Sequence, residues 1–164
     1  MTDAPDPVRP TPPGGVFDGS LPLYAVRVYY EDTDLSGIVY HANYLRWFER
    51  ARSDVLRMLE IDQRAAIEAG EGAYAVADVQ MRYLRPALLD DDIVIHTRCS
   101  ELKAASVRMV QEAKRDGETI CSATFRVGFV SPNGRPRRQP EAWRHAFTRI
   151  LDTSSDTSSL GEHA

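Results

Sequence analysis

Three carboxylates fall within four residues near the start of the chain, at Glu31, Asp32 and Asp34. Gly37 and then His41 follow them, and a pattern typical of an amphipathic helix begins directly afterwards. Like charges this close raise the pKa of a carboxyl group, whereas a helix N-terminus lowers it. The spacing therefore predicts a carboxylate whose acidity is adjusted for chemistry, either as a nucleophile or as a general base.

Each of these residues also has an alternative role. Asp34 is the candidate for the chemistry, and the alternative is an aspartate that caps the turn into the helix. Asp32 and Glu31 are expected to be solvated or structural. Gly37 suits either a close approach of the backbone to a substrate or a positive φ in the turn. His41 is an active-site candidate or a hydrogen-bonded surface histidine, and because no two histidines have metal-ligand spacing we expect no metal.

The spacing of apolar residues changes along the chain, and it predicts the elements that position these residues. Val26, Val28 and Tyr30 alternate with more polar neighbours, which predicts a half-buried strand leading into the acidic segment. From Asn43, which we expect to be the cap, the period becomes helical for about five turns. The apolar stripe of this helix consists of Tyr44, Phe48, Ala51, Val55 and Leu59. A short helical turn is expected over 63–69.

Four more strands with short connections are predicted, followed by a terminal helix over 141–151. The strands cover 75–83, 93–99, 105–113 and 119–129, and the first of them presents one apolar face from Ala75 to Tyr83. Clean alternation is typical of an antiparallel sheet with one buried face, which the long helix would cover. We predict an α+β fold with a five-stranded antiparallel sheet, whose exposed edge favours a homo-oligomer.

Composition sets the limits of the domain and of its class. Residues 1–20 are Pro-rich and 152–164 are rich in Ser and Thr, so both are expected to be disordered tails around a folded domain over 21–151. A net charge of −4 gives no reason to expect nucleic-acid binding. No apolar run predicts membrane insertion or a secretory signal, so we expect a cytoplasmic protein. Cys99 and Cys121 are expected to be buried, reduced thiols.

The segment 29–44 resembles the hotdog-fold acyl-CoA thioesterases, in the 4-hydroxybenzoyl-CoA thioesterase and YbgC-like branch. It carries the pattern Tyr-x-Asp-x-Asp-x-x-Gly-x-Val-x-x-x-Asn-Tyr, and 48–52 and 83–87 fit as well. The resemblance covers about 21–131. It implies a sheet wrapped around one long helix, dimers or tetramers with active sites between subunits, and hydrolysis of acyl-CoA to free acid and CoA. No cofactor is implied, since coenzyme A is part of the substrate.

The resemblance also assigns roles to individual residues. It places the catalytic carboxylate on Asp34 and, on His41, the backbone N–H that polarises the thioester carbonyl. The His41 side chain is expected to orient substrate or water. The residues expected to bind substrate are Gly37, Val39, Tyr40, Asn43, Tyr44, Lys103 and Ser106.

The phosphates of coenzyme A require cations. Lys103 and Ser106 match the loop that the branch uses for this purpose. Positions 104 and 105 are alanines where the 4-hydroxybenzoyl enzyme has basic residues, so this loop has fewer cations to bind the nucleotide. Arg82 and Arg85 are candidate helpers, and the alternative is an ordinary polar hairpin loop.

Other activities of this fold are less consistent with the residues present. The related hydratases need a histidine five residues after the aspartate, where this chain has Val39 or Gly37. A sister group of thioesterases places its carboxylate in the middle of the long helix, where Glu49 is the nearest candidate. A non-catalytic alternative is an adaptor associated with the Tol–Pal system or with acyl carrier protein.

The acyl group is expected to be short and aliphatic, with an aromatic acyl group as the second choice. The pocket for it is expected to be formed by two subunits. Its predicted lining includes Tyr40, Tyr44, Phe48 and Met81.

Overall fold

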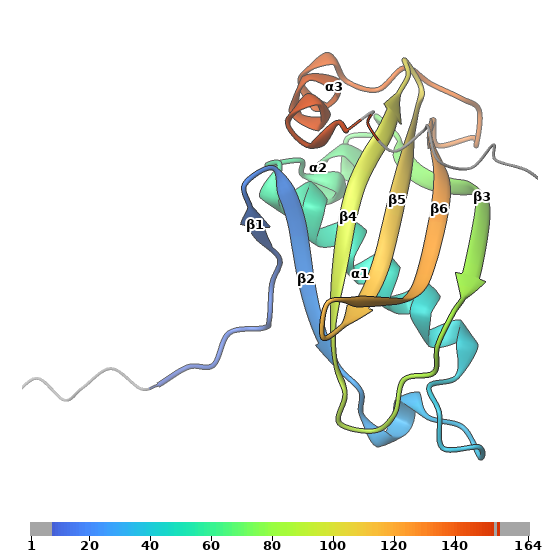
Figure 1. The fold of residues 1–164 in the computed structure, drawn as a ribbon. Coiled ribbons are helices and arrows are strands. Elements are labelled where there is room, and N and C mark those ends of the chain that lie inside the picture. Colours follow the sequence, from blue (N-terminus) through green and yellow to red (C-terminus); the bar gives the residue numbers. More distant parts are fainter. Residues whose placement is uncertain (1–7, 153, 155–164) are drawn as a thin grey trace, which may run out of the picture.

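The computed structural model describes residues 8–152 and residue 154. Its helices and strands follow in the order β1 (Val16–Asp18), β2 (Leu21–Arg27), η1 (Tyr30–Asp32), α1 (His41–Met58), α2 (Gln63–Glu68), β3 (Ala73–Tyr83), β4 (Asp92–Leu102), β5 (Ser106–Arg115), β6 (Glu118–Val130), α3 (Glu141–Phe147) and η2 (Thr148–Ile150). The η elements are single 3-10 turns. Figure 1 shows one sheet with α1 lying along one of its faces.

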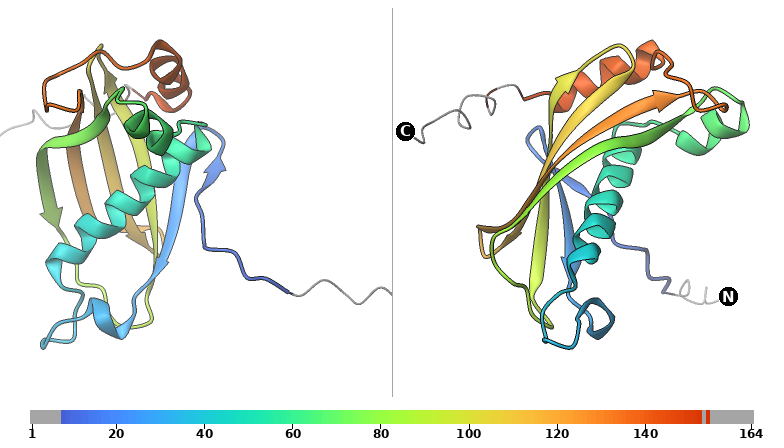
Figure 2. Two further views of the ribbon diagram at one scale, coloured as in Figure 1. Left: turned by 180° about the vertical axis from the view of Figure 1, so that it is seen from behind. Right: turned by 90° about the vertical axis from the view of Figure 1, so that its right-hand side faces the viewer.

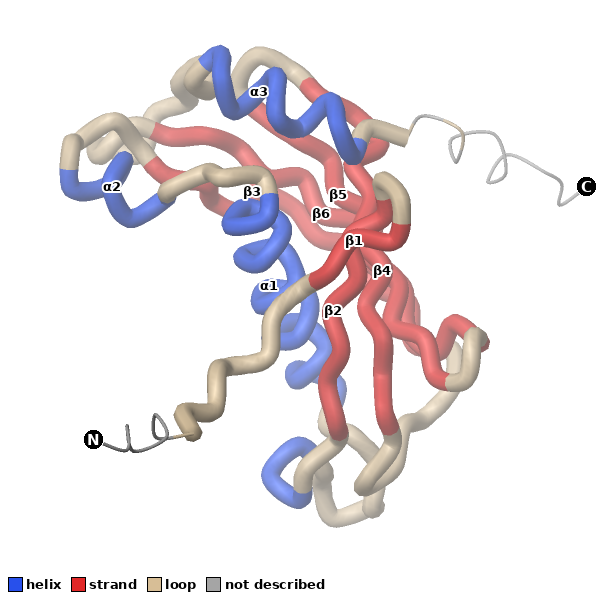
Figure 3. The backbone as a smooth tube through the Cα atoms, turned by 90° about the vertical axis from the view of Figure 1, so that its left-hand side faces the viewer, coloured by secondary structure: helices blue, strands red, loops and turns tan. Residues whose placement is uncertain are grey.

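The described strands form one antiparallel sheet in the order β1-β2-β4-β5-β6-β3. The sheet curves around α1, which lies on its concave side (Figure 2). The helices α2 and α3 gather at one end of the sheet, and the segment containing η1 lies at the opposite end (Figure 3). The α+β fold is confirmed, but the sheet has six strands and not the five predicted from the sequence.

The sixth strand comes from the segment that was predicted to be a disordered tail. Val16–Asp18 pairs with the start of β2 through a tight turn at Gly19, whose φ is 60°. At the other end, the Asp152 N–H donates to Cys99 O at 2.8 Å, so the ordered structure reaches the first residue of the predicted tail. The rest of the predicted C-terminal tail, apart from residue 154, and residues 1–7 lie outside the described residues.

The apolar stripe of α1 is buried against the sheet as predicted. All five of its residues are less than a tenth exposed, and the Phe48 ring meets Phe125 of β6 edge-on, with 5.9 Å between ring centres. Burying a large apolar side chain such as Phe48, Val55 or Leu59 contributes about 1.5–3 kcal/mol. The thiols of Cys99 and Cys121 are free and buried, as expected, and burial raises their pKa to about 11 and about 12.

Two predicted strands differ from the observed ones. The first strand ends at Arg27, and Tyr30 stands in η1 with its side chain exposed. In β3 the pairing with β6 shifts between Val76 and Asp78, and this bulge breaks the apolar face predicted from Ala75 to Tyr83. β3 is an edge strand whose apolar side chains are largely exposed, Val76 at 48% and Tyr83 at 50%.

No helix in the described part of the chain is both long enough and apolar enough to cross a membrane.

Candidate active site

Asp34 lies in a tight turn between η1 and α1. The segment that joins these two elements is at the lower end of the molecule in Figure 1. The Asp34 N–H donates to Ile38 O at 2.9 Å, and the Gly37 N–H donates to Asp34 O at 3.0 Å. Gly37 adopts a φ of 79°, which favours glycine, so the positive φ considered for it is present. Ile38 also forms a bridge with Leu88, which ties the turn to the loop before β4.

The Asp34 carboxylate is held by the serine two residues further on. The Ser36 N–H donates to Asp34 Oδ1 at 2.8 Å, and the Ser36 hydroxyl donates to the same oxygen. These hydrogen bonds, with a smaller effect from the nearby His41, hold the pKa of Asp34 below its ordinary value. The side chain is therefore an exposed, ionised carboxylate at neutral pH.

The neighbouring Asp32 has a structural role, as expected. Its Oδ2 accepts the Tyr29 N–H at 2.8 Å, and its carbonyl oxygen accepts both the Tyr40 N–H and the Asn43 side-chain amide at 2.8 Å. Asn43 is thus not the helix cap that the sequence predicted, because α1 already begins at His41. Its buried side chain instead fixes the acidic turn to the first turn of the helix.

The N-terminus of α1 is open toward this turn. Tyr40 stands at the cap position with an extended backbone and makes no side-chain capping bond. The first N–H groups of a helix have no partner inside the helix and carry its positive dipole end. The exposed His41 ring lies 4.4 Å from the Tyr40 ring centre, and the Tyr83 hydroxyl donates to His41 O at 3.0 Å. The first turn of α1 can therefore stabilise negative charge on a ligand.

The other residues predicted to bind substrate near this turn differ in exposure. Val39 and Tyr44 are buried, and burial raises the pKa of the Tyr44 hydroxyl to about 12. Tyr44 packs against Trp47 and Tyr83, which confirms its expected place in the core. Tyr40 is 46% exposed. Contact of these residues with substrate stays a prediction.

Lys103 and Ser106 lie at the opposite end of the sheet from Asp34. Lys103 lies in the turn between β4 and β5, and Ser106 begins β5, whereas the Asp34 turn is connected to the loop that precedes β4. At about 3.3 Å per residue, the length of β4 separates the two groups by roughly 35 Å. One copy of the chain therefore does not bring its predicted catalytic and phosphate-binding residues together.

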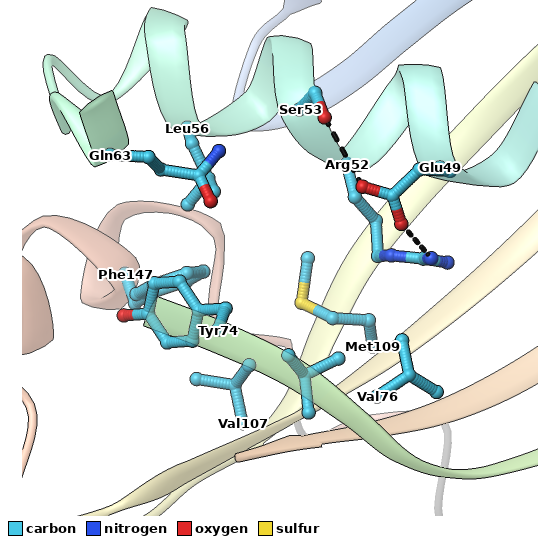
Figure 4. A pocket seen from close by; sticks show the side chains of 11 residues that line it. Glu49, Arg52, Ser53, Leu56, Gln63, Tyr74, Val76, Val107, Met109 and Phe147 are labelled. Carbon is cyan, nitrogen blue, oxygen red and sulfur yellow. Dashed lines mark hydrogen bonds and ion pairs between the residues drawn. The ribbon is translucent and has the colours of Figure 1, made fainter. Parts of the chain in front are cut away.

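A cavity of about 60 Å³ lies between the middle of α1 and the concave face of the sheet (Figure 4). Its lining consists of Glu49, Arg52, Ser53, Leu56, Gln63, Tyr74, Val76, Val107, Met109, Val127 and Phe147. None of the four residues predicted to line the acyl pocket borders it. Its floor is apolar, and its polar side comes from α1.

Arg52, on the wall of this cavity, is a buried cation that the sequence analysis did not find. Its guanidinium lies 3.9 Å above the centre of the Phe125 ring, and Nη1 donates to Gln111 Oε1 at 2.8 Å. Nη2 pairs with Glu49 at 2.5 Å. Burial lowers the pKa of the guanidinium, although the pairing with Glu49 opposes this effect. The ion pair with Arg52 therefore explains the presence of Glu49 in the middle of α1 without a catalytic role.

Gln111 completes this network from the centre of the sheet. It is fully buried on β5, and its amide donates to Phe48 O at 3.1 Å and to Thr97 Oγ1 at 3.0 Å. The sequence contained a signal for both residues. Gln111 falls in phase with the buried residues of its strand, and Arg52 falls four residues after Phe48 on the apolar stripe.

The sequence profile of the Thioesterase-like superfamily matches residues 28–151. The chain belongs to this family. It is 38% identical to the Acyl-CoA thioesterase YbgC of Haemophilus influenzae over 74% of this chain and 93% of that protein. It is 36% identical to the Acyl-CoA thioester hydrolase YbgC of Escherichia coli, over 73% of this chain and 90% of that one. The resemblance found in residues 29–44 is thereby confirmed.

A solved structure of a probable thioesterase from Bartonella henselae has the same thioesterase-like fold. The TM-score is 0.68 at 34% identity, over 72% of this chain and 98% of that one. Among the described residues, no group of three histidine, cysteine or acidic side chains is placed to hold a metal ion.

Proposed function

We propose that this chain hydrolyses short-chain acyl-CoA thioesters to the free acid and coenzyme A. The observation that carries the proposal is the placement of an ionised Asp34 carboxylate beside the uncapped N-terminus of α1. The names of the YbgC relatives support the same reaction.

Two reaction routes fit this arrangement. Asp34 either removes a proton from a water that attacks the thioester carbon, or attacks that carbon itself to form an anhydride that water then opens. In both routes negative charge develops on the carbonyl oxygen, where the N–H groups of the first turn of α1, beginning with His41, stabilise it. The C–S bond then breaks, and the sulfur leaves as the thiolate of coenzyme A, which takes up a proton.

A complete site requires a second copy of the chain. The exposed apolar side chains of β3 and the unpaired backbone of this edge strand favour antiparallel pairing with the β3 of a partner. The Tyr83 hydroxyl bonds to the start of α1, so the C-terminal end of β3 lies beside the helix N-terminus. Antiparallel pairing brings that end next to the N-terminal end of the partner's β3, near its β4–β5 turn. Lys103 and Ser106 of one copy thus approach Asp34 of the other.

The same pairing supports a place for the acyl group. The cavity beside α1 is bordered by Tyr74 and Val76, in the N-terminal half of β3, so the proposed pairing places it toward the partner's Asp34 turn. The cavity is small, about 60 Å³, which favours a short acyl chain over a long or aromatic one. We also propose that two such dimers assemble into a tetramer.

The direct test is a panel of acyl-CoA substrates with release of free thiol as the readout. Cys99 and Cys121 should not interfere, because both are buried with raised pKa values. Turnover should be fastest with short aliphatic acyl groups, and Asp34→Asn should remove about 10²–10⁴-fold of kcat. An intact acyl-CoA pool after long incubation with the wild-type protein would instead favour the adaptor function, as would full activity in Asp34→Asn.

A further inference from the structure

Asp91 and Asp92, where the chain enters β4, are each paired with an arginine. Arg115 Nη1, at the end of β5, lies 2.8 Å from Asp91 Oδ2, and both side chains are 25% exposed. Arg27 Nε lies 2.9 Å from Asp92 Oδ1, but these side chains are 60% and 70% exposed. Water and salt screen an exposed ion pair more than a partly buried one. The Arg115–Asp91 pair should therefore hold its two partners more firmly.

Arg115 and Asp91 together fix the segment 86–91, which we call the brace loop. Arg115 Nη1 also donates to Pro86 O at 2.9 Å. The Asp91 oxygen that accepts from Arg115 also accepts the Leu88 N–H at 2.9 Å, and the Asp91 N–H donates to Leu88 O at 3.1 Å. One guanidinium nitrogen and one carboxylate oxygen thus connect the first, the third and the last residue of this loop.

The other side of the brace loop contacts the chain between Asp34 and α1. The Val39 N–H donates to Ala87 O at 2.9 Å, and Ile38 forms a bridge with Leu88. Ile38 O in turn accepts the Asp34 N–H at 2.9 Å. Val39 and Ala87 are both buried, so the bond between them is sheltered from water. The brace loop therefore determines where the segment from Asp34 to the start of α1 lies.

The hydrogen bonds from Ser36 do not have this effect. They join Asp34 Oδ1 to a residue of the same turn, so they set the acidity of the carboxylate but not the position of the turn. Asp32 O accepts the Tyr40 N–H and thereby ties the beginning of the turn to α1, while the second half of the turn is held by the brace loop. Reacting groups must be held in place, because a displacement of about 1 Å can lower a rate about 10²-fold.

We infer that Arg115 is a positioning residue for the proposed hydrolysis. Through Asp91 and the brace loop, it holds the Asp34 carboxylate in its place relative to the first N–H groups of α1. The inference rests on the proposed function and adds to it a residue from outside the segment 29–44. Both hydrogen bonds of the Arg115 guanidinium go to the brace loop, so Arg115 acts through the backbone of that loop and not by contact with the substrate.

The test begins with Arg115→Met, which removes both hydrogen bonds and keeps an unbranched side chain. With a short acyl-CoA as substrate, kcat should fall about 10–100-fold, because Asp34 is no longer held in its reactive position. KM should change less than about 2-fold, since no group that binds the substrate is removed. Arg115→Lys should recover part of kcat, because a single nitrogen forms both bonds.

The second variant is Asp91→Asn, which removes the charge that Arg115 pairs with. It should lower kcat in the wild-type background but have little further effect in Arg115→Met, because the two residues act as one unit. The matched control is Arg27→Met, which breaks the neighbouring pair with Asp92 and should leave kcat unchanged. Equal losses of kcat in Arg27→Met and Arg115→Met would overturn the inference, as would additive losses from Arg115→Met and Asp91→Asn.

Amide hydrogen exchange tests the same connection without turnover. Exchange in the peptide 33–40 should be faster in Arg115→Met than in the wild type, because the Asp34 and Val39 N–H groups lose their fixed acceptors. Exchange in β6 should not change, and neither should exchange in 33–40 of Arg27→Met. A general rise that includes β6 would count against the inference, because it would indicate loss of the fold.

The two readouts also separate this inference from the proposed function. Unchanged exchange in Arg115→Met, or faster exchange with an unchanged kcat, would show that Arg115 does not position Asp34. If the wild type hydrolyses no thioester while exchange in 33–40 responds as expected, the proposed function fails and the connection through the brace loop stands.

Discussion

The two ends of the molecule are built by different kinds of contact. At the Asp34 end, the hydrogen bonds to the carboxylates of Asp34 and Asp32 join residues two or three positions apart, from Ser36 to Asp34 and from Tyr29 to Asp32. At the opposite end, Gln139 joins residues 36 and 65 positions away, in the β4–β5 turn and in β3. The bonds that hold the candidate catalytic carboxylate are thus local, whereas those that hold the candidate phosphate-binding turn depend on the assembled fold.

Because the length of β4 separates the two ends, one copy of the chain holds the proposed catalytic residue at one end and the proposed phosphate-binding residues at the other. The hydrogen bonds that hold the Asp34 carboxylate are local, although the bridge between Ile38 and Leu88 fixes the turn to the loop before β4. The surroundings of Lys103 form only when β3, the β4–β5 turn and the loop after β6 come together. Antiparallel pairing through β3 then unites a locally folded end of one copy with a long-range end of the other.

The largest expected effect comes from mixing two defective variants. Asp34→Asn disables one end, and Lys103→Ala/Ser106→Ala disables the other. In a heterodimer of the two, one of the two composite sites is intact. Co-refolding the variants in equal amounts should therefore recover about a quarter of wild-type activity, measured as thiol release at low acyl-CoA concentration. A mixture no more active than the mean of the two separate proteins would place both ends in one protomer.

A smaller effect is expected on stability, and it should separate the two ends. Gln139→Ala leaves the buried Tyr74 hydroxyl and the Lys103 carbonyl without partners, so the free energy of unfolding should fall by about 1–3 kcal/mol. Ser36→Ala, in the exposed turn, should change it by less than about 0.5 kcal/mol. Chemical denaturation measures both values.

The Tyr74 bond can be isolated by a double-mutant cycle. Tyr74→Phe should cost little in the Gln139→Ala background, because its hydroxyl no longer has an acceptor there. Equal losses from Gln139→Ala and Ser36→Ala, or independent losses in the cycle, would contradict the distinction between the two ends.

The smallest effect concerns the acidity of Asp34. Because the Ser36 hydroxyl and N–H hold its pKa below the ordinary value, Asp34 stays ionised as the pH falls, and activity is lost only as the pH passes through that lowered pKa. Ser36→Ala removes the hydroxyl bond and raises the pKa. The acid limb of the kcat/KM profile should then move to higher pH. Ser36→Thr, which keeps a hydroxyl, is the control, and an unmoved limb in Ser36→Ala would show that Asp34 does not control the reaction.

Much of the fold could be predicted from periodicity, because the long helix and the strands β4 to β6 each bury one regular face. Errors occurred where a contact with a distant segment overrode the local pattern. The bulge at Val76 and Asp78 shifts the face of β3, and pairing with β2 orders Val16–Asp18 despite the prolines and glycines before it. Asn43 was assigned to a cap because its type favours that position, but its amide instead bonds to the turn at Asp32.

By itself, the sequence determined the acidic turn, the apolar stripe of the long helix and the family, since all three depend on residues close together along the chain. Only the tertiary structure decided which charges have partners. Lys103 shares Glu101 with Arg108, and Arg115 pairs with Asp91, which lies 24 positions earlier in the chain. Electrostatic and hydrogen-bonding partners act through space, so a list of residues in chain order does not reveal which charges are already neutralised.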